Sequence, residues 1–371
     1  MSPQAQEFTL GVEEEYQIID PTTRELCPHG TRILTNAQET LGDTVQPEVY
    51  LSQIEIATKV CHTLAEVRSE LIRLRGAIIA AAAKDGSQIA AAGTHPFSKW
   101  ADQQVTPRER YKGLIVDYQQ LMRDLIIFGC HVHVGVSDRE IAVQVMNRAR
   151  LWLSPLLALA SGSPFWQSED TGYASYRTEL WSRWPMAGLP LAFKSKADYD
   201  ALIQDLIATE TIKDGTKIYW DVRLSERFPT IEFRVTDVCT TIDEAVMVAG
   251  LTRALAQTCY GEVTENQPFT DVRPEILRAA HWHAARHGLT EHLIDVINKR
   301  ALPAREMIDK LLNFVKPALE AQGDWDEVSQ LVYHTLQHGT SADRQRQAYQ
   351  RRNSMEDVVD LLVAETAKDV T

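Results

Sequence analysis

The segment GCHVHVG, residues 129–135, places two of the chain's 11 histidines one residue apart between valines. Successive side chains of a β-strand point to opposite faces, so His131 and His133 would share one face and the valines the other. Two imidazoles on one face can bind a metal ion, contact a phosphate or substrate, or belong to an ordinary half-buried surface. Other segments with the same alternation bear on this choice.

Four further segments, TLGVEEEYQIID, LSQIEIAT, IYWDVRLS and TIEFRVTD, also alternate between apolar and polar residues. Each alone is typical of a half-exposed antiparallel strand. Glu14 is the one polar residue on the apolar side of the first segment. The opposite side of the four segments carries an unusual set of charged residues: Glu13, Glu15, Glu55, Arg223, Glu232 and Arg234.

Carboxylates that lie side by side on a strand face repel one another, so a positive charge should compensate them. Mg²⁺ binds a few carboxylates together with substrate phosphates, and a histidine ligand is compatible with Mg²⁺ or Mn²⁺. The planar guanidinium group of arginine suits phosphate or carboxylate oxygens. The combined set therefore indicates phosphoryl transfer from a nucleotide, with positioning and charge neutralisation as the means of catalysis.

The strands that would carry these residues do not alternate regularly with single helices. We expect strands at 8–20, 50–58, 88–93, 129–136, 217–224 and 230–237, and helices at 64–83, 107–128, 139–159 and 242–260. After about residue 272 the pattern is almost wholly helical. No GxGxxG or GxxxxGK[ST] segment is present, so metals and arginines would have to hold the phosphates of a nucleotide.

The composition is that of a globular enzyme, with 371 residues of which 44% are hydrophobic and 24% charged. A net charge of −13 should repel nucleic acids and anionic membranes, and we expect neither as a partner. The five cysteines form no CxxC pair, which argues against a disulfide framework. The start MSPQAQEF lacks the features of a signal peptide, so we expect a cytoplasmic protein.

The segments FTLGVEEEYQIID, IEIAT, GTHPF, GCHVHVGV, YWDVRLSERFPTIEFRVTD and RHGL follow one another in this order. Together they resemble the carboxylate–amine ligase family of the YbdK type, which is related to glutamate–cysteine ligases, from about Phe8 to about Leu289. The resemblance implies a glutamine-synthetase-like α+β fold, in which an antiparallel sheet forms an active-site funnel with helices on its outer face. It implies a single ligase domain over residues 1–371, mostly helical from about 272.

The resemblance also implies roles for individual residues. His131 would be a metal ligand and His133 a phosphate or substrate contact, while Arg234 and Arg223 would act on the nucleotide phosphates. Arg177 and Arg286 are candidates for binding a substrate carboxylate. The remaining implied metal ligands are Glu13, Glu15, Glu55 and Glu232.

The chemistry implied by the resemblance has two steps. ATP, with Mg²⁺ or Mn²⁺, phosphorylates a carboxylate, expected to be the γ-carboxylate of glutamate. An amine then displaces phosphate from this acyl phosphate and leaves a γ-glutamyl amide. Weak glutamate–cysteine ligase activity is part of the expectation, but the motifs do not identify the amine.

Two alternatives compete with parts of this interpretation. A zinc-dependent amide hydrolase would use the HxH strand, with His283 and His287, four residues apart, as a further metal-binding pair. A scaffold protein without activity would not need so many like charges on one face.

The aromatic segment 165–184 is either a substrate lid or an interface between two copies of the chain in a homodimer. His95 either caps the end of its strand or contributes to function.

Overall fold

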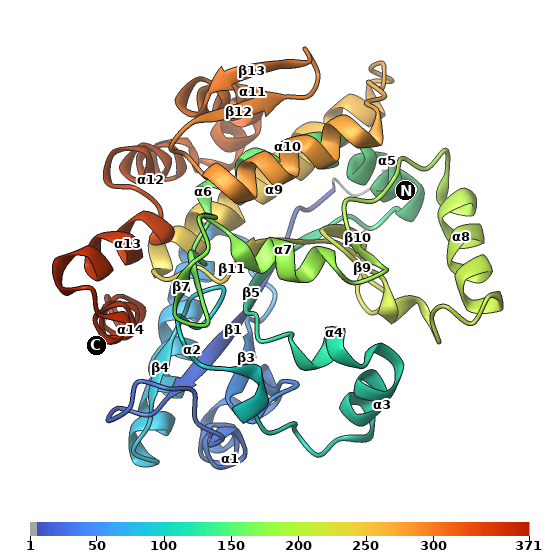
Figure 1. The fold of residues 1–371 in the computed structure, drawn as a ribbon. Helices are drawn as coiled ribbons and strands as arrows, with labels where there is room; N and C mark the ends of the chain where they lie inside the picture. Colours follow the sequence, from blue (N-terminus) through green and yellow to red (C-terminus); the bar gives the residue numbers. More distant parts are fainter. Residues whose placement is uncertain (1–5, 371) are drawn as a thin grey trace.

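An antiparallel seven-stranded sheet runs through the centre of the protein, whose computed structural model describes residues 6–370 (Figure 1). The strand order is β10-β11-β5-β1-β3-β2, with β4 also paired to β1, and each of these pairs is antiparallel. The strands are β1 (Leu10–Ile19), β2 (Val45–Pro47), β3 (Gln53–Ala57), β4 (Gln88–Ala90), β5 (Gly129–Gly135), β10 (Val222–Leu224) and β11 (Thr230–Asp237). Each strand expected from the sequence therefore has a counterpart in the structure.

The apolar side of the sheet forms the core together with two long helices. Along β1, Leu10, Val12 and Ile18 are buried, as the alternation predicts. Helices α2 (Leu64–Lys84) and α9 (Ile242–Thr264) pack against each other and against β1. Thr241 is the N-cap residue of α9. Its side chain accepts a hydrogen bond from the backbone N–H of Glu244 and completes a capping box.

Glu14, the polar residue on the apolar side of β1, is compensated by a buried arginine. The carboxylate of Glu14 and the guanidinium of Arg75 on α2 are both 0% exposed and form two hydrogen bonds of 2.5 and 3.0 Å. The hydroxyl of Tyr16 also donates to Glu14. Arg75 donates further to the carbonyls of Cys239 and Thr240, 2.8 Å away, so this ion pair joins β1, α2 and the segment after β11.

The remaining helices surround the sheet. They are α1 (Gly30–Leu41), α3 (Glu109–Tyr118), α4 (Gln120–Arg123), α5 (Arg139–Ala149), α6 (Leu153–Leu159), α7 (Tyr176–Ser182), α8 (Lys196–Ala208), α10 (Pro274–His287), α11 (Ala304–Gln322), α12 (Trp325–His338), α13 (Ser341–Arg352) and α14 (Met355–Thr366). In Figure 1 the C-terminal helices α12–α14 lie on the opposite side of the molecule from α3 and α8.

Three small two-stranded sheets complete the fold, and one of them departs from the sequence-based expectation. They are β6 (Phe165–Trp166) with β7 (Glu169–Asp170), β8 (Ala187–Gly188) with β9 (Tyr219–Trp220), and β12 (His292–Asp295) with β13 (Arg300–Pro303). The pair β12–β13 interrupts the region expected to be almost wholly helical. A short apolar run such as HLIDVI suits a helix or a strand, and here Lys299, with φ 54°, helps to turn the chain back into a hairpin.

Hydrogen bonds and ion pairs connect the C-terminal helices to the sheet and to α9. The backbone N–H of Ala91, just after β4, donates to Oγ1 of Thr366 in α14 at 2.9 Å. Gln345 of α13 donates to the carbonyl of Gly162 at 2.9 Å. Arg344 forms ion pairs with Glu244 of α9 and with Glu365 of α14. The last part of the chain is thus joined to the earliest strands.

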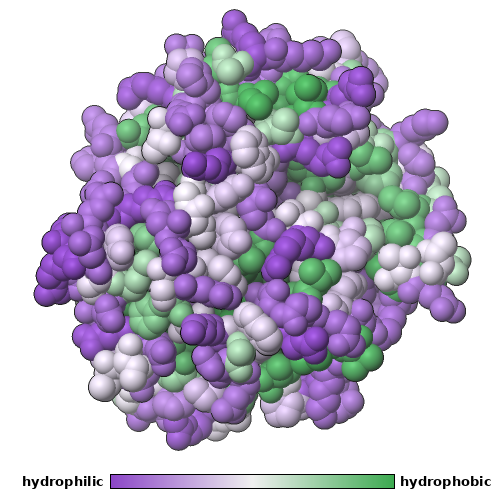
Figure 2. Space-filling view, in the orientation of Figure 1, coloured by the Kyte–Doolittle hydropathy of each residue, from purple (hydrophilic) through white to green (hydrophobic). Residues whose placement is uncertain are grey.

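The face of the protein seen in Figure 1 is mostly hydrophilic, with apolar residues in scattered groups (Figure 2). Across residues 6–370, none of the helices combines the length and the apolar character that crossing a membrane requires. All five cysteines are free and buried, in line with the absence of a CxxC pair.

His95 has the geometry of a structural cap. Its side chain is fully buried, and its Nδ1 accepts hydrogen bonds from the backbone N–H groups of Phe97 and Ser98 at 3.2 and 2.9 Å. Its Nε2 donates to the carbonyl of Arg24 at 2.9 Å, so the ring is neutral with its proton on Nε2. Burial, which outweighs the hydrogen bond to Arg24, lowers the pKa of His95 to about 3.

This shift predicts a specific dependence of stability on pH. In the unfolded chain His95 becomes protonated below its ordinary pKa of 6.5, whereas in the folded chain it stays neutral down to about pH 3. Lowering the pH from 6.5 to about 3 therefore stabilises the unfolded state relative to the folded state. Replacing His95 by Asn keeps a backbone-capping oxygen and should reduce the slope of the unfolding free energy by up to about 1.4 kcal/mol per pH unit. Urea unfolding at a series of pH values measures the slope, with exposed His62→Asn as control. An unchanged slope would contradict the prediction.

Candidate active site

The register of the sheet brings the charged residues together on the face opposite the core. Glu13 on β1 lies opposite His131 on β5, and Glu15 lies opposite Glu55 on β3. On the other side of β5, Glu232 of β11 lies opposite His133, and Arg223 of β10 lies opposite Glu232. Cross-strand partners have Cβ atoms about 5 Å apart, so five strands contribute to one continuous charged surface. This surface lines a cavity of about 260 Å³.

A first group of possible metal ligands consists of Glu13, His133 and Glu232, which offer ligand atoms within 4.8 Å of one another. Glu13 lies between the two histidines, 3.3 Å from Nδ1 of His131 and 3.3 Å from Nε2 of His133. Burial opposes ionisation of Glu13, but its hydrogen bonds and charge interactions with both histidines prevail and hold its pKa well below the usual value. Glu13 is therefore a carboxylate at neutral pH.

A second group consists of Glu15, Glu48 and Glu55. Burial and the neighbouring Glu48 raise the pKa of Glu15 to about 7. Burial, followed by repulsion from Glu13, Glu48 and Glu15, raises the pKa of Glu55 well above its usual value. Three carboxylates held this close repel one another, and binding of a hard divalent ion relieves such repulsion.

Glu48 is a member of the site that the sequence did not reveal. It follows β2 in the segment QPEVY and belongs to no alternating strand, so neither periodicity nor spacing distinguishes it from a surface glutamate. Only the folding of this loop beside β3 brings its carboxylate to Glu15 and Glu55.

Two arginines hold Glu232. Arg223 contacts both carboxylate oxygens, with Nε 2.8 Å from Oε2 and Nη2 3.0 Å from Oε1, and Arg234 also pairs with Oε1. Burial opposes ionisation of Glu232, but the charges of Arg234 and Arg223 outweigh it and hold the pKa of Glu232 well below its usual value.

Arg177 of α7 reaches the same cavity because Gly129 has no side chain. A Cβ atom at residue 129 would lie 2.9 Å from Nε2 of His131 and closer still to Nη2 of Arg177. The backbone N–H of Gly129 donates to Glu15 at 2.6 Å. Arg177 is 3% exposed, and its Nε has no hydrogen-bond partner within residues 6–370, so this guanidinium retains a free donor beside the carboxylates.

The structure brings nine of the ten expected site residues to this cavity, and the tenth, Arg286, lies elsewhere. Arg286 donates to the carbonyl of Gly172 and lies over the ring of Tyr173, 5.5 Å from its centroid. The nine are Glu13, Glu15, Glu55, His131, His133, Arg177, Arg223, Glu232 and Arg234.

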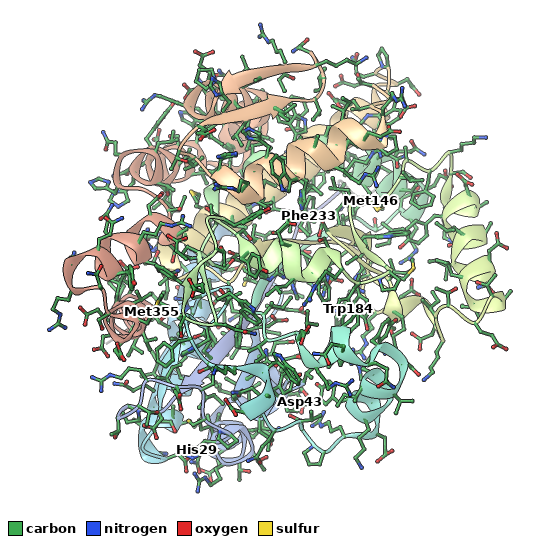
Figure 3. The ribbon with its side chains drawn as sticks, viewed as in Figure 1. His29, Asp43, Met146, Trp184, Phe233 and Met355 are labelled. Carbon is green, nitrogen blue, oxygen red and sulfur yellow. The ribbon has the colours of Figure 1, made fainter. Side chains whose placement is uncertain are left out.

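The cavity has an aromatic wall. Trp181 and Trp184, from the segment 165–184, and Tyr219 of β9 lie with ring centroids 5.4 to 5.6 Å apart. Trp184, labelled in Figure 3, also stacks on Tyr118 at 4.3 Å. Part of the aromatic segment thus faces the charged residues. Both alternatives for this segment, a lid and a subunit interface, stay predictions.

A second cavity of about 890 Å³ adjoins the charged centre. Glu13, His133 and Phe228 line both cavities. The second cavity is otherwise bounded by Val60, Tyr260 and the ends of β1 and β5. The charged centre therefore borders two cavities.

Comparisons with known proteins agree with this geometry. Residues 9–361 match the family described as glutamate–cysteine ligase family 2. A relative from Rhodopirellula baltica, provisionally named glutamate–cysteine ligase 2, is 44% identical over 363 residues, which cover 96% of each chain. A relative from Herpetosiphon aurantiacus with the same provisional name is 42% identical, covering 98% of this chain and 94% of its own.

Two solved structures share the fold. The bifunctional glutathione synthetase from Pasteurella multocida has a TM-score of 0.74 at 16% identity, covering 98% of this chain and 52% of that one. The glutamate–cysteine ligase from Francisella tularensis in complex with AMP has a TM-score of 0.72 at 13% identity, covering 99% and 90%. The expected glutamine-synthetase-like α+β fold is confirmed. The chain is an ATP-dependent ligase that forms a carbon–nitrogen bond, and it belongs to glutamate–cysteine ligase family 2.

Proposed function

We propose that the protein joins the γ-carboxylate of glutamate to an amine through an acyl phosphate. A carboxylate oxygen of the acid attacks the γ-phosphorus of ATP, and ADP leaves. The amine nitrogen then attacks the acyl carbon, phosphate leaves with that oxygen, and the nitrogen loses a proton. The observation that carries the proposal is a single cavity lined by both groups of possible metal ligands together with Arg177, Arg223 and Arg234, because phosphoryl transfer needs metal-binding and charge-neutralising groups and no covalent nucleophile.

The donor set fits divalent cations. Besides the carboxylates, Nε2 of His131 is buried and has no hydrogen-bond partner within residues 6–370, and the buried Nε2 of His133 faces Glu13 at 3.3 Å. Mg²⁺ or Mn²⁺ held by these groups would neutralise the charge of the phosphates. The first group favours His133 as the histidine ligand beside Glu13 and Glu232. The expectation that His131 is the ligand and His133 the substrate contact stays a prediction, and substitution of each tests it.

The arginines have separate tasks in this proposal. Arg223 and Arg234 keep Glu232 ionised and orient it towards Glu13 and His133, and Nε of Arg234 has no hydrogen-bond partner within residues 6–370. Arg177, with its free Nε, binds the phosphoryl oxygens or the carboxylate of the acid. The aromatic wall excludes water from the reactive acyl phosphate.

The names of the relatives suggest the substrates to test first. They are named as glutamate–cysteine ligases, and the structure from Francisella tularensis contains AMP. We therefore take glutamate as the acid and include cysteine among the amines.

The test is phosphate release from ATP with Mg²⁺ and glutamate, measured against a panel of amines that includes cysteine. Controls omit ATP or replace Mg²⁺ by zinc. Phosphate and ADP formed only when an amine is present, with an equal amount of amide, would support the proposal. Amide hydrolysis that needs zinc and no ATP would instead support the hydrolase that uses the HxH strand.

Replacing Arg234 by Lys should reduce kcat/KM for ATP although the positive charge remains. An ammonium group cannot reproduce the planar contacts that Arg234 makes. Hydrogen bonds to charged groups contribute about 1.5–3 kcal/mol, so the expected loss is roughly tenfold to a hundredfold. Steady-state kinetics of phosphate release measure it, with Arg32→Lys on the exposed side of α1 as the matched control. Wild-type kinetics in Arg234→Lys would refute the assignment.

A further inference from the structure

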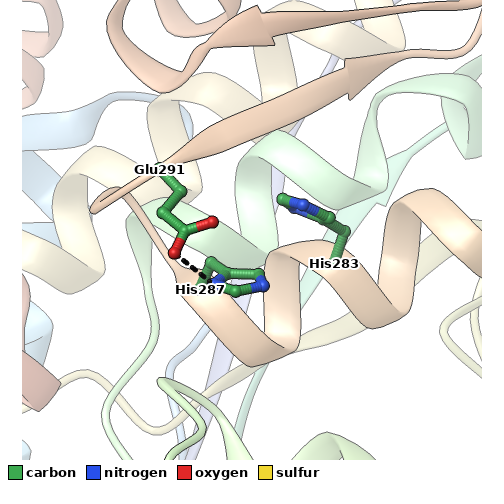
Figure 4. Close-up of side chains that lie close together, drawn as sticks. All are labelled: His283, His287 and Glu291. Atoms are coloured by element: carbon green, nitrogen blue, oxygen red, sulfur yellow. Dashed lines mark ion pairs between the residues drawn. The ribbon is translucent and has the colours of Figure 1, made fainter.

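Two histidines and a glutamate form a cluster at the C-terminal end of α10, apart from the cavity described above (Figure 4). His283 and His287 are one helical turn apart, and Glu291 lies in the segment that leads to β12. One ligand atom from each of the three side chains lies within 4.8 Å of the others. Nδ1 of His287 is 3.3 Å from Oε1 of Glu291, and the two imidazole centroids are 4.4 Å apart.

The atoms of this cluster are available to an ion from solvent. Nδ1 of His283 is buried and has no hydrogen-bond partner among the residues that the structure describes. Both histidines are partly exposed and Glu291 is exposed, so an ion can enter without any opening of the core.

We propose that His283, His287 and Glu291 bind a divalent transition-metal ion of the zinc class, with water as a further ligand. Two imidazoles and one carboxylate suit Zn²⁺, whereas Mg²⁺ and Ca²⁺ prefer sites made of oxygen ligands. Ligands about 2.1 Å from a tetrahedral ion lie roughly 3.4 Å apart. The distance between His287 and Glu291 already matches this spacing, and rotation of the exposed Glu291 side chain can bring the three ligand atoms together.

The position of the cluster indicates a stabilising role. The carbonyl of Ala285 accepts hydrogen bonds of 2.9 Å from the backbone N–H groups of Ala174 and Ser175. Nε1 of Trp282 donates to the hydroxyl of Tyr173 at 3.1 Å. A bound ion would fix the last turn of α10 to the segment before β12. It would thereby stabilise the part of α10 that bonds to residues 173–175. These residues come directly before α7, the helix that carries Arg177.

The chain contains a matched control pair of histidines. His334 and His338 are also one turn apart, on α12, with ring centroids 4.1 Å apart. Nδ1 of His338 already bonds to the carbonyl of His334 at 3.0 Å. Within residues 6–370 no carboxylate completes a three-residue group with this pair. The two pairs therefore share a spacing and differ in the third ligand.

The experiment counts Zn²⁺ bound by the full-length protein in equilibrium dialysis with excess Mg²⁺. We expect His283→Gln/His287→Gln to bind one equivalent fewer than the wild type and His334→Gln/His338→Gln to bind the same number. Glu291→Gln should keep the equivalent with an affinity lower by about tenfold or more, because the ligand loses its charge interaction with the ion. With Co²⁺ as the probe, the strong visible absorption of a tetrahedral ion at this site should disappear in His283→Gln/His287→Gln only.

Thermal unfolding provides a second readout that does not involve ATP. Zn²⁺ should raise the Tm of the wild type more than that of His283→Gln/His287→Gln, while the two proteins unfold alike without zinc. Equal zinc stoichiometry in these two proteins, or loss of the same equivalent in the control variant, would overturn the proposal. Because zinc is counted without turnover, failure here leaves the proposed ligase reaction untouched.

Discussion

Replacing Glu13 by Gln removes almost all ATP turnover and leaves the protein folded. Glu13 lies 3.3 Å from both histidines of β5 and belongs to the first group of possible metal ligands. An amide carries no charge, so its oxygen holds a divalent ion much more weakly than a carboxylate does, and the electrostatic effect of such an ion on phosphoryl transfer is several kcal/mol. Because about 1.4 kcal/mol corresponds to a factor of ten, kcat should fall at least about a hundredfold.

The stability of this variant should equal or exceed that of the wild type. The charge of Glu13 is the largest electrostatic cause, after burial, of the raised pKa of Glu55, so its removal relieves repulsion within the cavity. Phosphate release and thermal unfolding, measured on the same preparation, test both statements. Glu39→Gln, at an exposed position of α1, serves as control. Unchanged turnover in Glu13→Gln would eliminate the metal-binding role of this strand face.

Replacing Arg75 by Met destabilises the protein by about 3–5 kcal/mol, because it leaves the buried carboxylate of Glu14 without its partner. Both side chains are 0% exposed, so water cannot take the place of the guanidinium. The carbonyls of Cys239 and Thr240 lose donors as well. Neither residue lines the charged cavity, so the expected effect falls on folding and not on the reaction itself.

A second substitution identifies the origin of this loss. In Glu14→Leu/Arg75→Met no buried charge remains, so the double variant should recover part of the lost stability. The recovery stays incomplete because the hydroxyl of Tyr16 loses its acceptor. Urea unfolding measures the free energies, with Arg73→Met, a partly exposed neighbour on α2, as control. A loss below about 1 kcal/mol in Arg75→Met would contradict the prediction.

The sequence predicts the two faces of each central strand because period-two alternation follows from burial of one side of a sheet. It thereby assigns Glu13, His131 and Glu232 to one face before any contact is known. It does not reveal which residues face each other, because strand order and register depend on contacts between distant segments. That Glu13 lies opposite His131, and Glu232 opposite His133, is a result of the folded structure.

The positions of residues outside the strands are harder to predict from the sequence. Glu48 reaches the site from a loop that has no periodicity. Arg286 lies on α10, and its helical position directs it to Gly172 instead of the cavity. The ion pair of Glu14 with Arg75 joins residues 61 positions apart, so the alternation could mark Glu14 as an exception without naming its partner.

The hydrogen bond between Ala91 and Thr366 has a consequence for synthesis of the protein on the ribosome. Strand β4 and the segment after it emerge early, but Thr366 of α14, to which Ala91 bonds, is synthesised 275 residues later. The ion pair between Glu244 and Arg344 likewise forms only after Arg344 has been synthesised. The nascent chain must therefore carry β4 without its contacts to α14 until α14 has been synthesised, because contacts between distant segments form only when both exist. A ribosome stalled before α14 should thus display a chain that proteases cleave readily, whereas a chain that includes folded α14 resists them.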